Sequence, residues 1–403
     1  MNSLRYRTAR DTQDLLGQVF TPPAIADLLM DSITSHGDFA SQVLDLGAGE
    51  GSLTESALKK LPQAESLLVE IDSVLAASTR KKLKRRNVKA QVICGSVFDE
   101  DFLGSKTPNL ILTNPPYVST PITSAIEKTL FTSNLDIPTS GGWVRGDAAF
   151  IAKAWSISRI GCGLGLIIAS PIIRDFRFKK MRETLISQLS GLCVIQLDSR
   201  TFSNAEVQAF IVTGSRAINR RRKIILKKAL VDGTITDEIE ITHAEGIQSL
   251  DIDYHQALLR MGLSAKNSHE TLESIGTKLT RGSKSLKDFE RLGLKAFHTT
   301  DFQKNLNEIS LRGAHKAYKL AGQGDILLPR VGSRCLIKQV KVKAGKGIFT
   351  DCVYRLTLDP NLIPAAWRTL TSQFGAEWRL AHASGSCARH LTSQAILTMP
   401  LIS

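Results

Sequence analysis

The 403-residue sequence predicts an α/β fold with a largely parallel sheet, followed by a smaller domain of mixed α+β structure. Three observations lead to this prediction. Short apolar runs alternate with amphipathic segments in the first half, a glycine-rich turn follows the first apolar run, and the alternation stops near residue 245. Alternating strands and helices build a parallel sheet that helices cover on both faces.

Seven apolar runs predict the strands of this sheet, because central strands buried on both faces are almost continuously apolar. The strands are expected at Val43–Leu46, Ser66–Ile71, Ala90–Cys94, Leu110–Thr113, Leu164–Ala169, Cys193–Leu197 and Ala209–Thr213. Helices are expected at Ile25–Ile33, Ser52–Leu61, Val74–Leu83 and Phe150–Ile160. The change of pattern predicts two domains, residues 1–245 and 246–403.

Composition narrows the class of protein. The formal net charge of +14 favours a polyanionic partner such as nucleic acid, although a basic enzyme with a small substrate has the same charge. Six cysteines without a C-x-x-C pair argue against a structural zinc site and a disulfide scaffold. The most hydrophobic stretch, residues 160–173, is too short to span a bilayer, and glycines and a proline interrupt it. We therefore expect a cytoplasmic protein with no metal and no membrane partner.

The first candidate site is the sequence LDLGAGEGSL, residues 44–53, in which Gly47, Ala48 and Gly49 follow a strand. Glycines permit a tight turn and close approach of the backbone to a ligand. Ser52 and Glu55 have the spacing of a capping box at the start of the next helix. Glu70 ends the following strand, where a carboxylate can bind both hydroxyls of a ribose. The pattern indicates a nucleoside cofactor.

Two cofactors compete for this turn, and an ordinary glycine-rich turn is the alternative to both. The spacing is G-x-G-x-G rather than the dinucleotide pattern G-x-G-x-x-G. Asp45 precedes the turn and Glu50 lies within it. Acidic groups repel a pyrophosphate but attract the sulfonium and ammonium groups of S-adenosylmethionine. The methyl donor is therefore the favoured cofactor.

The second candidate site is LILTNPPY, in which a buried strand delivers Asn114, Pro115, Pro116 and Tyr117 to the carboxyl edge of the sheet. The prolines stiffen the backbone, so the Asn114 side-chain oxygen and the Pro115 carbonyl form a rigid pair of acceptors. Such a pair can bind both hydrogens of an exocyclic amino group and direct its lone pair at a methyl group. Tyr117 can stack on the base. A simple strand terminator is the structural alternative.

The order of these motifs resembles the gamma class of N6-adenine DNA methyltransferases. GQVFTPPAIADLLMD, residues 17–31, resembles the N-terminal cofactor motif of that family. The resemblance implies that Thr21 and Pro22 border the methionine end of S-adenosylmethionine, together with Asp45, Gly47, Ala48 and Gly49. The resemblance also places Asn114 among the residues that contact the cofactor. It assigns Glu70 and Ile71 to the ribose and adenine, and Ser96 and Val97 to the adenine.

The sequence departs from this family at Ser96, where the family usually has an aspartate. A serine oxygen accepts a hydrogen bond without the strengthening effect of charge. Asp99 and Asp101 lie close enough in the sequence to take the role instead. Which of the three contacts the adenine is left open.

Weaker resemblances extend along the chain. Residues 146–155, GDAAFIAKAW, resemble the family segment after NPPY. Residues 200–214 resemble a late motif in which Phe202 would pack against the extruded base, although a core position fits this residue equally well. The last domain resembles the recognition domains of type I restriction specificity subunits in three stretches, residues 324–334, 349–364 and 383–401.

Together these resemblances imply a Rossmann-like S-adenosylmethionine-dependent methyltransferase domain followed by a target-recognition domain. They imply a monomer that acts on the N6 amino group of adenine in double-stranded DNA, within a restriction-modification system that supplies a cognate endonuclease as a further partner. A stacked base must be extruded for this reaction. The basic stretch 216–228, with Arg220, Arg221 and Arg222, is expected to contact phosphates. Methylation of RNA or protein glutamine, and a non-catalytic specificity subunit, are the alternatives.

Overall fold

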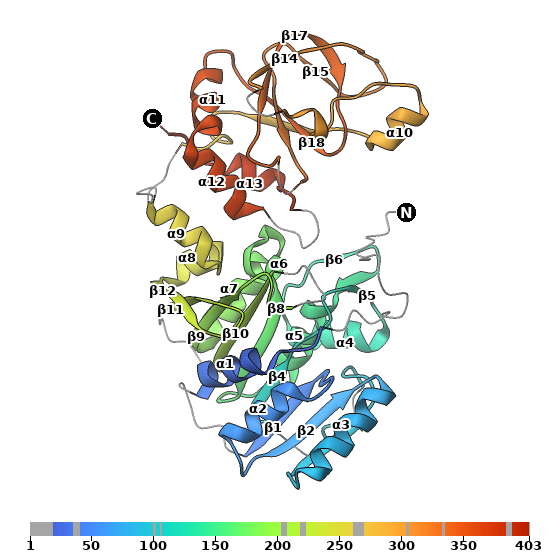
Figure 1. The fold of residues 1–403 in the computed structure, drawn as a ribbon, viewed down its shortest axis with the longest axis vertical. Coiled ribbons are helices and arrows are strands. Elements are labelled where there is room, and N and C mark those ends of the chain that lie inside the picture. Colours follow the sequence, from blue (N-terminus) through green and yellow to red (C-terminus); the bar gives the residue numbers. More distant parts are fainter. Residues whose placement is uncertain are drawn as a thin grey trace. The chain divides into compact units, whose positions relative to one another are not determined.

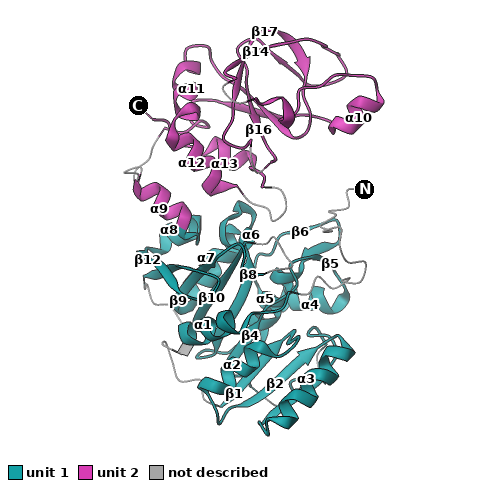
Figure 2. Ribbon diagram, in the orientation of Figure 1, with its two compact units in different colours: residues 1–252 teal, residues 253–403 magenta. Residues whose placement is uncertain are grey.

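The structure is a computed structural model that divides into two compact units, residues 1–252 and 253–403 (Figure 2). It describes residues 19–34, 41–99, 102–104, 107–202, 208–217, 223–260, 270–303, 306–332, 335–383 and 389–402. The boundary expected near residue 245 lies seven residues before this division.

Among the described residues, nine strands of the first unit form one sheet in the order β12-β11-β9-β10-β8-β4-β1-β2-β3 (Figure 1). The five strands from β3 to β8 run parallel, whereas β10 lies antiparallel between β8 and β9. All seven predicted strands are confirmed. The strands are β1 (Gln42–Leu46), β2 (Glu65–Glu70), β3 (Ala90–Cys94), β4 (Leu110–Thr113), β8 (Gly163–Ala169), β9 (Leu189–Leu197), β10 (Ala209–Arg216), β11 (Ile224–Ala229) and β12 (Ile235–Ile241).

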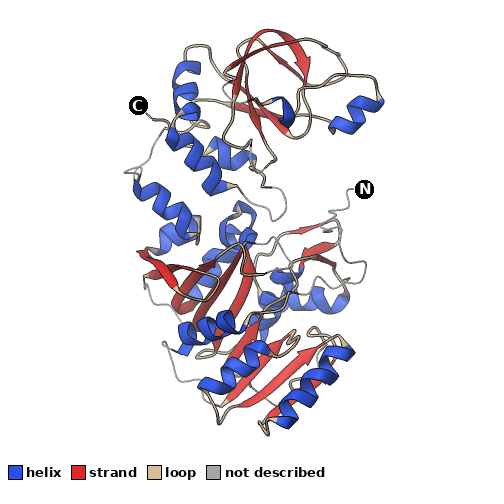
Figure 3. Cartoon of the chain, viewed as in Figure 1, coloured by secondary structure: helices blue, strands red, loops and turns tan. Residues whose placement is uncertain are grey.

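Helices cover both faces of this sheet, as the alternating pattern predicted (Figure 3). Successive strand residues point to opposite faces, so Val43 packs on the side of α1 and α2, and Leu44 packs on the side of α5. One face carries α1 (Pro23–Thr34), α2 (Ser52–Lys60) and α3 (Ser73–Arg85). The other carries α5 (Gly146–Ile157), α6 (Ser170–Arg174), the 3-10 turn η1 (Phe176–Phe178) and α7 (Lys179–Gln188).

The capping box predicted at Ser52 and Glu55 is wrong. The cap of α2 is Gly51, whose φ of 80° is left-handed, and Ser52 is already the first helical residue. The tight turn needs this positive φ, which glycine adopts without strain, so a residue without a side chain takes the capping position. The Glu55 carboxylate instead forms ion pairs with Lys82, at 2.9 Å, and Arg86, at 3.2 Å.

The small sheet after NPPY was not predicted. It pairs β5 (Ser119–Pro121) and β6 (Thr139–Ser140) with β7 (Trp143–Arg145), and α4 (Ser124–Ser133) lies between β5 and β6 in the chain. Near the end of the first unit, α8 (His243–Gln248) packs against α7. Because β7 leads directly into α5, the small sheet connects the NPPY turn to the helix that covers the sheet.

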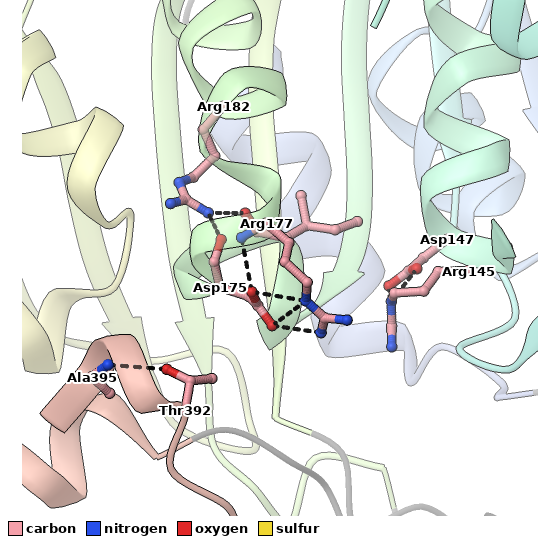
Figure 4. A network of polar contacts seen from close by, with 8 residues as sticks. Arg145, Asp147, Asp175, Arg177, Arg182, Thr392 and Ala395 are labelled. Atoms are coloured by element: carbon pink, nitrogen blue, oxygen red, sulfur yellow. Dashed lines mark hydrogen bonds and ion pairs between the residues drawn. The ribbon is translucent and has the colours of Figure 1, made fainter. Parts of the chain in front are cut away.

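The second unit has the mixed structure expected of it. Its sheet has the order β13-β18-β16-β17-β14, with β15 paired to β17. A cluster of buried side chains joins this sheet to α11 and α12. Thr392 caps α13 by accepting the Ala395 N–H at 3.1 Å (Figure 4). The elements are α9 (Ile252–Arg260), β13 (Lys278–Arg281), α10 (Leu286–Arg291), η2 (Thr299–Asp301), β14 (Glu308–Leu311), β15 (Leu320–Gly322), β16 (Ile326–Pro329), β17 (Val340–Ile348), β18 (Val353–Thr357), α11 (Ile363–Thr371), α12 (Gln373–His382) and α13 (Ser393–Leu397).

Candidate active site

The candidate site lies where the carboxyl ends of β1 and β4 meet. These strands are parallel neighbours, and the chain leaves β1 toward β2 on one side while β4 and β8 follow on the other. In open α/β sheets, ligands bind at such a reversal of strand order. The glycine turn, residues 47–51, follows β1, and the NPPY turn, residues 114–117, follows β4. The two predicted motifs are therefore adjacent in the fold.

The glycine turn is built from three left-handed residues. Gly47, Gly49 and Gly51 have φ values of 72°, 53° and 80°. A Cβ atom at Gly47 would lie 3.0 Å from the Phe150 ring, and one at Gly49 would lie 3.7 Å from the Phe20 ring. Side chains are therefore excluded by strain at both positions, and two aromatic rings flank the turn. Neither phenylalanine was identified from the sequence.

Glu70 ties the glycine turn to the end of β2. Its carboxylate is buried, and it accepts the Gly49 N–H at 2.7 Å and the Asp72 N–H at 2.8 Å. Each carboxylate oxygen has two lone pairs, so these bonds leave acceptor capacity for the hydroxyls of a ribose. Beside it, Ile71 is 57% exposed and offers an apolar surface to a ligand.

Asp45 is the buried carboxylate below the glycine turn. Thr54 donates a hydrogen bond to its Oδ2 at 2.7 Å, but Oδ1 has no hydrogen-bond partner among the described residues. Burial raises the pKa of this carboxyl group to about 6, and the nearby Glu70 charge adds to the effect. An unpaired buried acceptor is costly, so a cationic donor such as an ammonium group fits this position.

Replacing Asp45 by asparagine is expected to stabilise the fold at high pH. Because the folded-state pKa lies above its ordinary value, ionisation of Asp45 destabilises the protein as pH rises toward 6, and the full cost remains at higher pH. We expect a gain of about 1–3 kcal/mol in the free energy of unfolding at about pH 8, and little gain at about pH 4. Urea denaturation at both pH values measures the difference. An equal effect at both values would contradict the assigned burial cost.

The loop after β3 is shaped by Ser96 and Asp99. The Ser96 N–H donates to Asp99 Oδ2 at 3.1 Å, and the Ser96 hydroxyl oxygen accepts the Phe98 N–H at 3.1 Å. The Asp99 carboxylate therefore lies back against Ser96. The sequence alone did not determine whether Asp99 approaches Ser96. Val97 is buried in the core, and Asp101 lies outside the described residues.

Asn114 is held by segments far apart in the sequence. Its Nδ2 group donates to the Val19 carbonyl at 2.8 Å and to Thr21 Oγ1 at 2.9 Å. Its Oδ1 atom accepts the Tyr117 hydroxyl at 2.9 Å. Because Nδ2 faces two acceptors, the side-chain amide has one favourable orientation. The structure thus brings Thr21 to Asn114, while Pro22 follows Thr21 at the entry to α1.

The start of α5 supports the NPPY turn. The Gly146 N–H donates to the Val118 carbonyl at 2.8 Å, and a Cβ atom at Gly146 would lie 2.6 Å from the Pro116 carbonyl oxygen. Asp147 is buried and pairs with Arg145 at 2.8 Å (Figure 4). Burial raises the pKa of the Tyr117 phenol, and the Asp147 charge acts in the same direction. Tyr117 therefore stays a neutral hydrogen-bond donor.

Of the residues predicted to contact DNA by name, the structure describes Phe202 but not the three arginines. Phe202 is buried in the apolar cluster on the α1 face, which corresponds to the core interpretation, and Tyr117 packs against the same cluster. Arg220, Arg221 and Arg222 lie outside the described residues. Elsewhere in the same basic stretch, Lys227 pairs with Glu238 at 2.9 Å, Lys223 pairs with Glu240, and the Arg216 guanidinium lies 3.7 Å from the Trp155 ring centroid.

Within the ranges given above, no group of three histidine, cysteine, aspartate or glutamate side chains could hold a metal ion. In the same part of the chain, no helix is both long and apolar enough to cross a membrane.

Comparison with known proteins defines the class. Residues 24–145 match the methyltransferase small domain family, and the sheet order with the glycine turn after β1 is the fold of S-adenosylmethionine-dependent methyltransferases. The chain therefore contains a methyltransferase domain. The match spans both candidate motifs, from the start of α1 to the end of β7.

The curated relatives point to several substrates. The chain is 28% identical over 109 residues to a release factor glutamine methyltransferase of Geobacter sulfurreducens, which is 27% of this chain and 38% of that protein. It is 35% identical over 78 residues to ribosomal RNA small subunit methyltransferase C of Pseudomonas fluorescens, which is 19% of this chain and 23% of that protein. It is 22% identical over 227 residues to the type I restriction enzyme MpnII methylase subunit of Mycoplasma pneumoniae, covering 51% and 41%. The chain spans less than half the length of each.

The similarity to a solved structure covers both units. The type IIG restriction endonuclease BpuSI overlaps 96% of this chain and 59% of its own, with a TM-score of 0.53 and 11% sequence identity. At 11% sequence identity, this similarity shows a shared fold.

Proposed function

We propose that this protein transfers a methyl group from S-adenosylmethionine to the N6 amino group of adenine in duplex DNA. The observation that carries the proposal is the fixed orientation of the Asn114 amide. Nδ2 is committed to Val19 and Thr21, and Oδ1 accepts the Tyr117 hydroxyl with one of its two lone pairs. The second lone pair of Oδ1 and the Pro115 carbonyl remain as acceptors at the end of β4, next to the glycine turn.

The residues around the glycine turn fit the donor. Asp45 Oδ1, buried and without a partner in the described structure, is suited to the ammonium group, and Glu70 to the ribose hydroxyls. The apolar side chain of Ile71 suits the adenine ring. When bound, S-adenosylmethionine supplies an electrophilic methyl group on its sulfonium. Ser96 or Asp99 is left as the candidate acceptor for the adenine amino group.

The NPPY turn prepares the nucleophile. The lone pair of an exocyclic amino group is delocalised into the ring, so the nitrogen is a weak nucleophile. Two acceptors that bind its two hydrogens favour a tetrahedral nitrogen, and rigid placement lowers the barrier because the acceptors need no reorganisation. Tyr117 donates to Asn114, and under this proposal its ring contacts the extruded base.

The second unit favours DNA over the other amino substrates. Under this proposal, residues 1–245 bind the donor and catalyse, and residues 246–403 recognise the DNA target. The net charge of +14 suits a polyanion, and the fold likeness to a restriction endonuclease extends through both units. A monomer, a cognate endonuclease and a restriction-modification role belong to the same proposal.

A second candidate function is methylation of a protein glutamine or an RNA base. It is favoured by the local similarity to methyltransferases that carry those names, at 28% and 35% identity. The same pair of acceptors suits a glutamine amide as well as a base amino group. A non-catalytic specificity subunit is disfavoured, because its Asn114 would not need so complete a set of hydrogen bonds.

The deciding experiment is expression of the full chain in a host that lacks adenine methylation, followed by sequencing of modified bases in its DNA. N6-methyladenine in one sequence context, absent with an Asn114→Ala variant, supports the proposal. Unmodified DNA together with a methylated glutamine or RNA base in the same cells would overturn it in favour of the second candidate.

A further inference from the structure

The segment after β8 lies beside the NPPY turn. Strands β4 and β8 are parallel neighbours, with Thr113 opposite Leu166, so their carboxyl ends reach the same edge of the sheet. The chain continues from β8 into α6 and then into η1. Residues 170–178 therefore border the site that begins at Asn114, and Figure 4 shows Asp175 and Arg177 in one view with the Arg145–Asp147 pair.

Two consecutive side chains of this segment project into solvent. Phe176 is 59% exposed and the side chain of Arg177 is 66% exposed, whereas the next residue, Phe178, is buried in the core. A rigid aromatic ring and a guanidinium are thus presented side by side. A phenylalanine ring exposed to water forgoes a favourable transfer free energy, so a ligand that covers the ring regains it.

Arg177 is held in place by a buried carboxylate. Its Nη2 donates to Asp175 Oδ2 at 2.7 Å, and its Nε lies 3.2 Å from both carboxylate oxygens. Burial alone would raise the pKa of Asp175, but the bonds from Arg177 outweigh it and lower the pKa. The Nη1 group of Arg177 has no hydrogen-bond partner within the described ranges. The guanidinium is therefore oriented with donors left for another ligand.

Two arginines, of which Arg182 is fully buried, fix the backbone that carries this pair. Arg182 of α7 donates to the carbonyls of Ile172, at 3.0 Å, and Asp175, at 2.7 Å (Figure 4). It also reaches the carbonyls of residues 247 and 248. Arg174 forms an ion pair with the buried Asp251 at 2.7 Å. The projection is therefore rigid, so contact with a ligand costs little conformational entropy.

We propose that Phe176 and Arg177 form a DNA-contact element beside the adenine pocket. Arg177 binds a backbone phosphate of the substrate strand through its outward N–H groups, and Phe176 packs against a base or sugar next to the extruded nucleotide. A planar guanidinium suits a phosphate, and an aromatic ring suits any base. The proposal rests on the proposed function, because it takes the substrate to be duplex DNA.

The test compares this pair with a matched pair at the other end of β8. Arg159 and Ile160 are also adjacent and exposed, with Ile160 66% exposed, but they precede β8 and lie at the opposite edge of the sheet. The full chain is prepared as Arg177→Gln, Arg177→Lys and Phe176→Ser, with Arg159→Gln and Ile160→Ser as controls. Binding to a short duplex DNA is measured over a range of salt concentrations.

Arg177→Gln is expected to weaken DNA binding about tenfold and to reduce the slope of log K against log salt by about one. Arg177→Lys keeps the charge and the slope. Phe176→Ser weakens binding several-fold without changing the slope, because no ion is released. The two control variants bind as the unchanged protein does. Donor binding, measured by calorimetry, stays unchanged in all five variants, which a merely structural role of Arg177 would not allow.

The experiment distinguishes a failure of the proposed DNA-contact element from a failure of the proposed function. If the unchanged protein binds DNA and Arg177→Gln keeps its affinity and slope, the contact element is wrong and the proposed function stands. If Arg177→Gln and Arg177→Lys both lose donor binding, Arg177 is structural and the inference is overturned. If the unchanged protein binds no DNA, both the inference and the proposed function are overturned. If the variants affect only binding to a protein subunit, the inference alone is overturned.

Discussion

Replacing Asn114 by alanine is expected to lower the rate of methyl transfer by about 10²–10³ while donor binding stays nearly intact. Under the proposed function, the side chain supplies one of the two acceptors for the amino group. It forms no hydrogen bond with Asp45 or Glu70 in the described part of the chain, and these are the residues proposed to anchor the donor. Transfer of tritiated methyl groups to duplex DNA measures the rate, and calorimetry measures donor binding.

A matched control for this variant lies at the other end of β4. Asn109 precedes β4 at the opposite edge of the sheet and is exposed. Asn109→Ala is expected to keep the rate of the unchanged protein. Near-full activity of Asn114→Ala would remove the NPPY turn from the chemistry, whereas an equal loss in both variants would indicate that the effect arises from disturbance of β4.

Replacing Arg182 by leucine is expected to destabilise the first unit by about 3 kcal/mol. The guanidinium is buried and donates to four carbonyl groups, at residues 172, 175, 247 and 248. Leucine fills much of the space but leaves these acceptors without a donor. Urea denaturation of the full chain, followed by far-ultraviolet circular dichroism, measures the change in the free energy of unfolding.

Lys180 on the same helix provides the control. Its side chain is 78% exposed and pairs with Asp136 at 3.1 Å, so Lys180→Leu is expected to change the free energy of unfolding by less than about 1 kcal/mol. A similar small effect of Arg182→Leu would mean that the four carbonyls find other partners. It would also weaken the argument that the turn carrying Phe176 and Arg177 is rigid.

The fold of the first unit was readable from the sequence because its strands are buried on both faces. Continuous apolar runs such as Leu110–Thr113 have no other stable location. The strands β11 and β12 were missed because their exposed positions carry charge: Lys227 and Lys228 lie opposite Glu238 and Asp237. Cross-strand ion pairs of this kind appear in a sequence as a basic stretch followed by an acidic one, which does not have the continuous apolar pattern of a buried strand.

The site was predictable wherever a motif carries its own geometry. The glycines that need positive φ and the strand that ends in Asn114 were recognised by local pattern. The bonds from Asn114 to Val19 and Thr21 span more than 90 residues, and no local pattern encodes them. The same holds for Phe20 and Phe150 beside the glycine turn and for Gly146 against Pro116, because these contacts arise only when the elements pack.

If the proposed function holds, the anchoring of the Asn114 amide determines which nucleobases the site accepts. Rotating the amide by half a turn would place Oδ1 against the Val19 carbonyl, so the side chain cannot exchange an acceptor for a donor to suit a different base. A keto oxygen, as in hypoxanthine, would face two oxygens and be repelled. An amino group on cytosine would satisfy both acceptors as well as adenine does. Under the proposed function, the NPPY turn would therefore reject keto bases by hydrogen-bond polarity, and the choice between purine and pyrimidine would depend on the size of the pocket and on the DNA contacts around it.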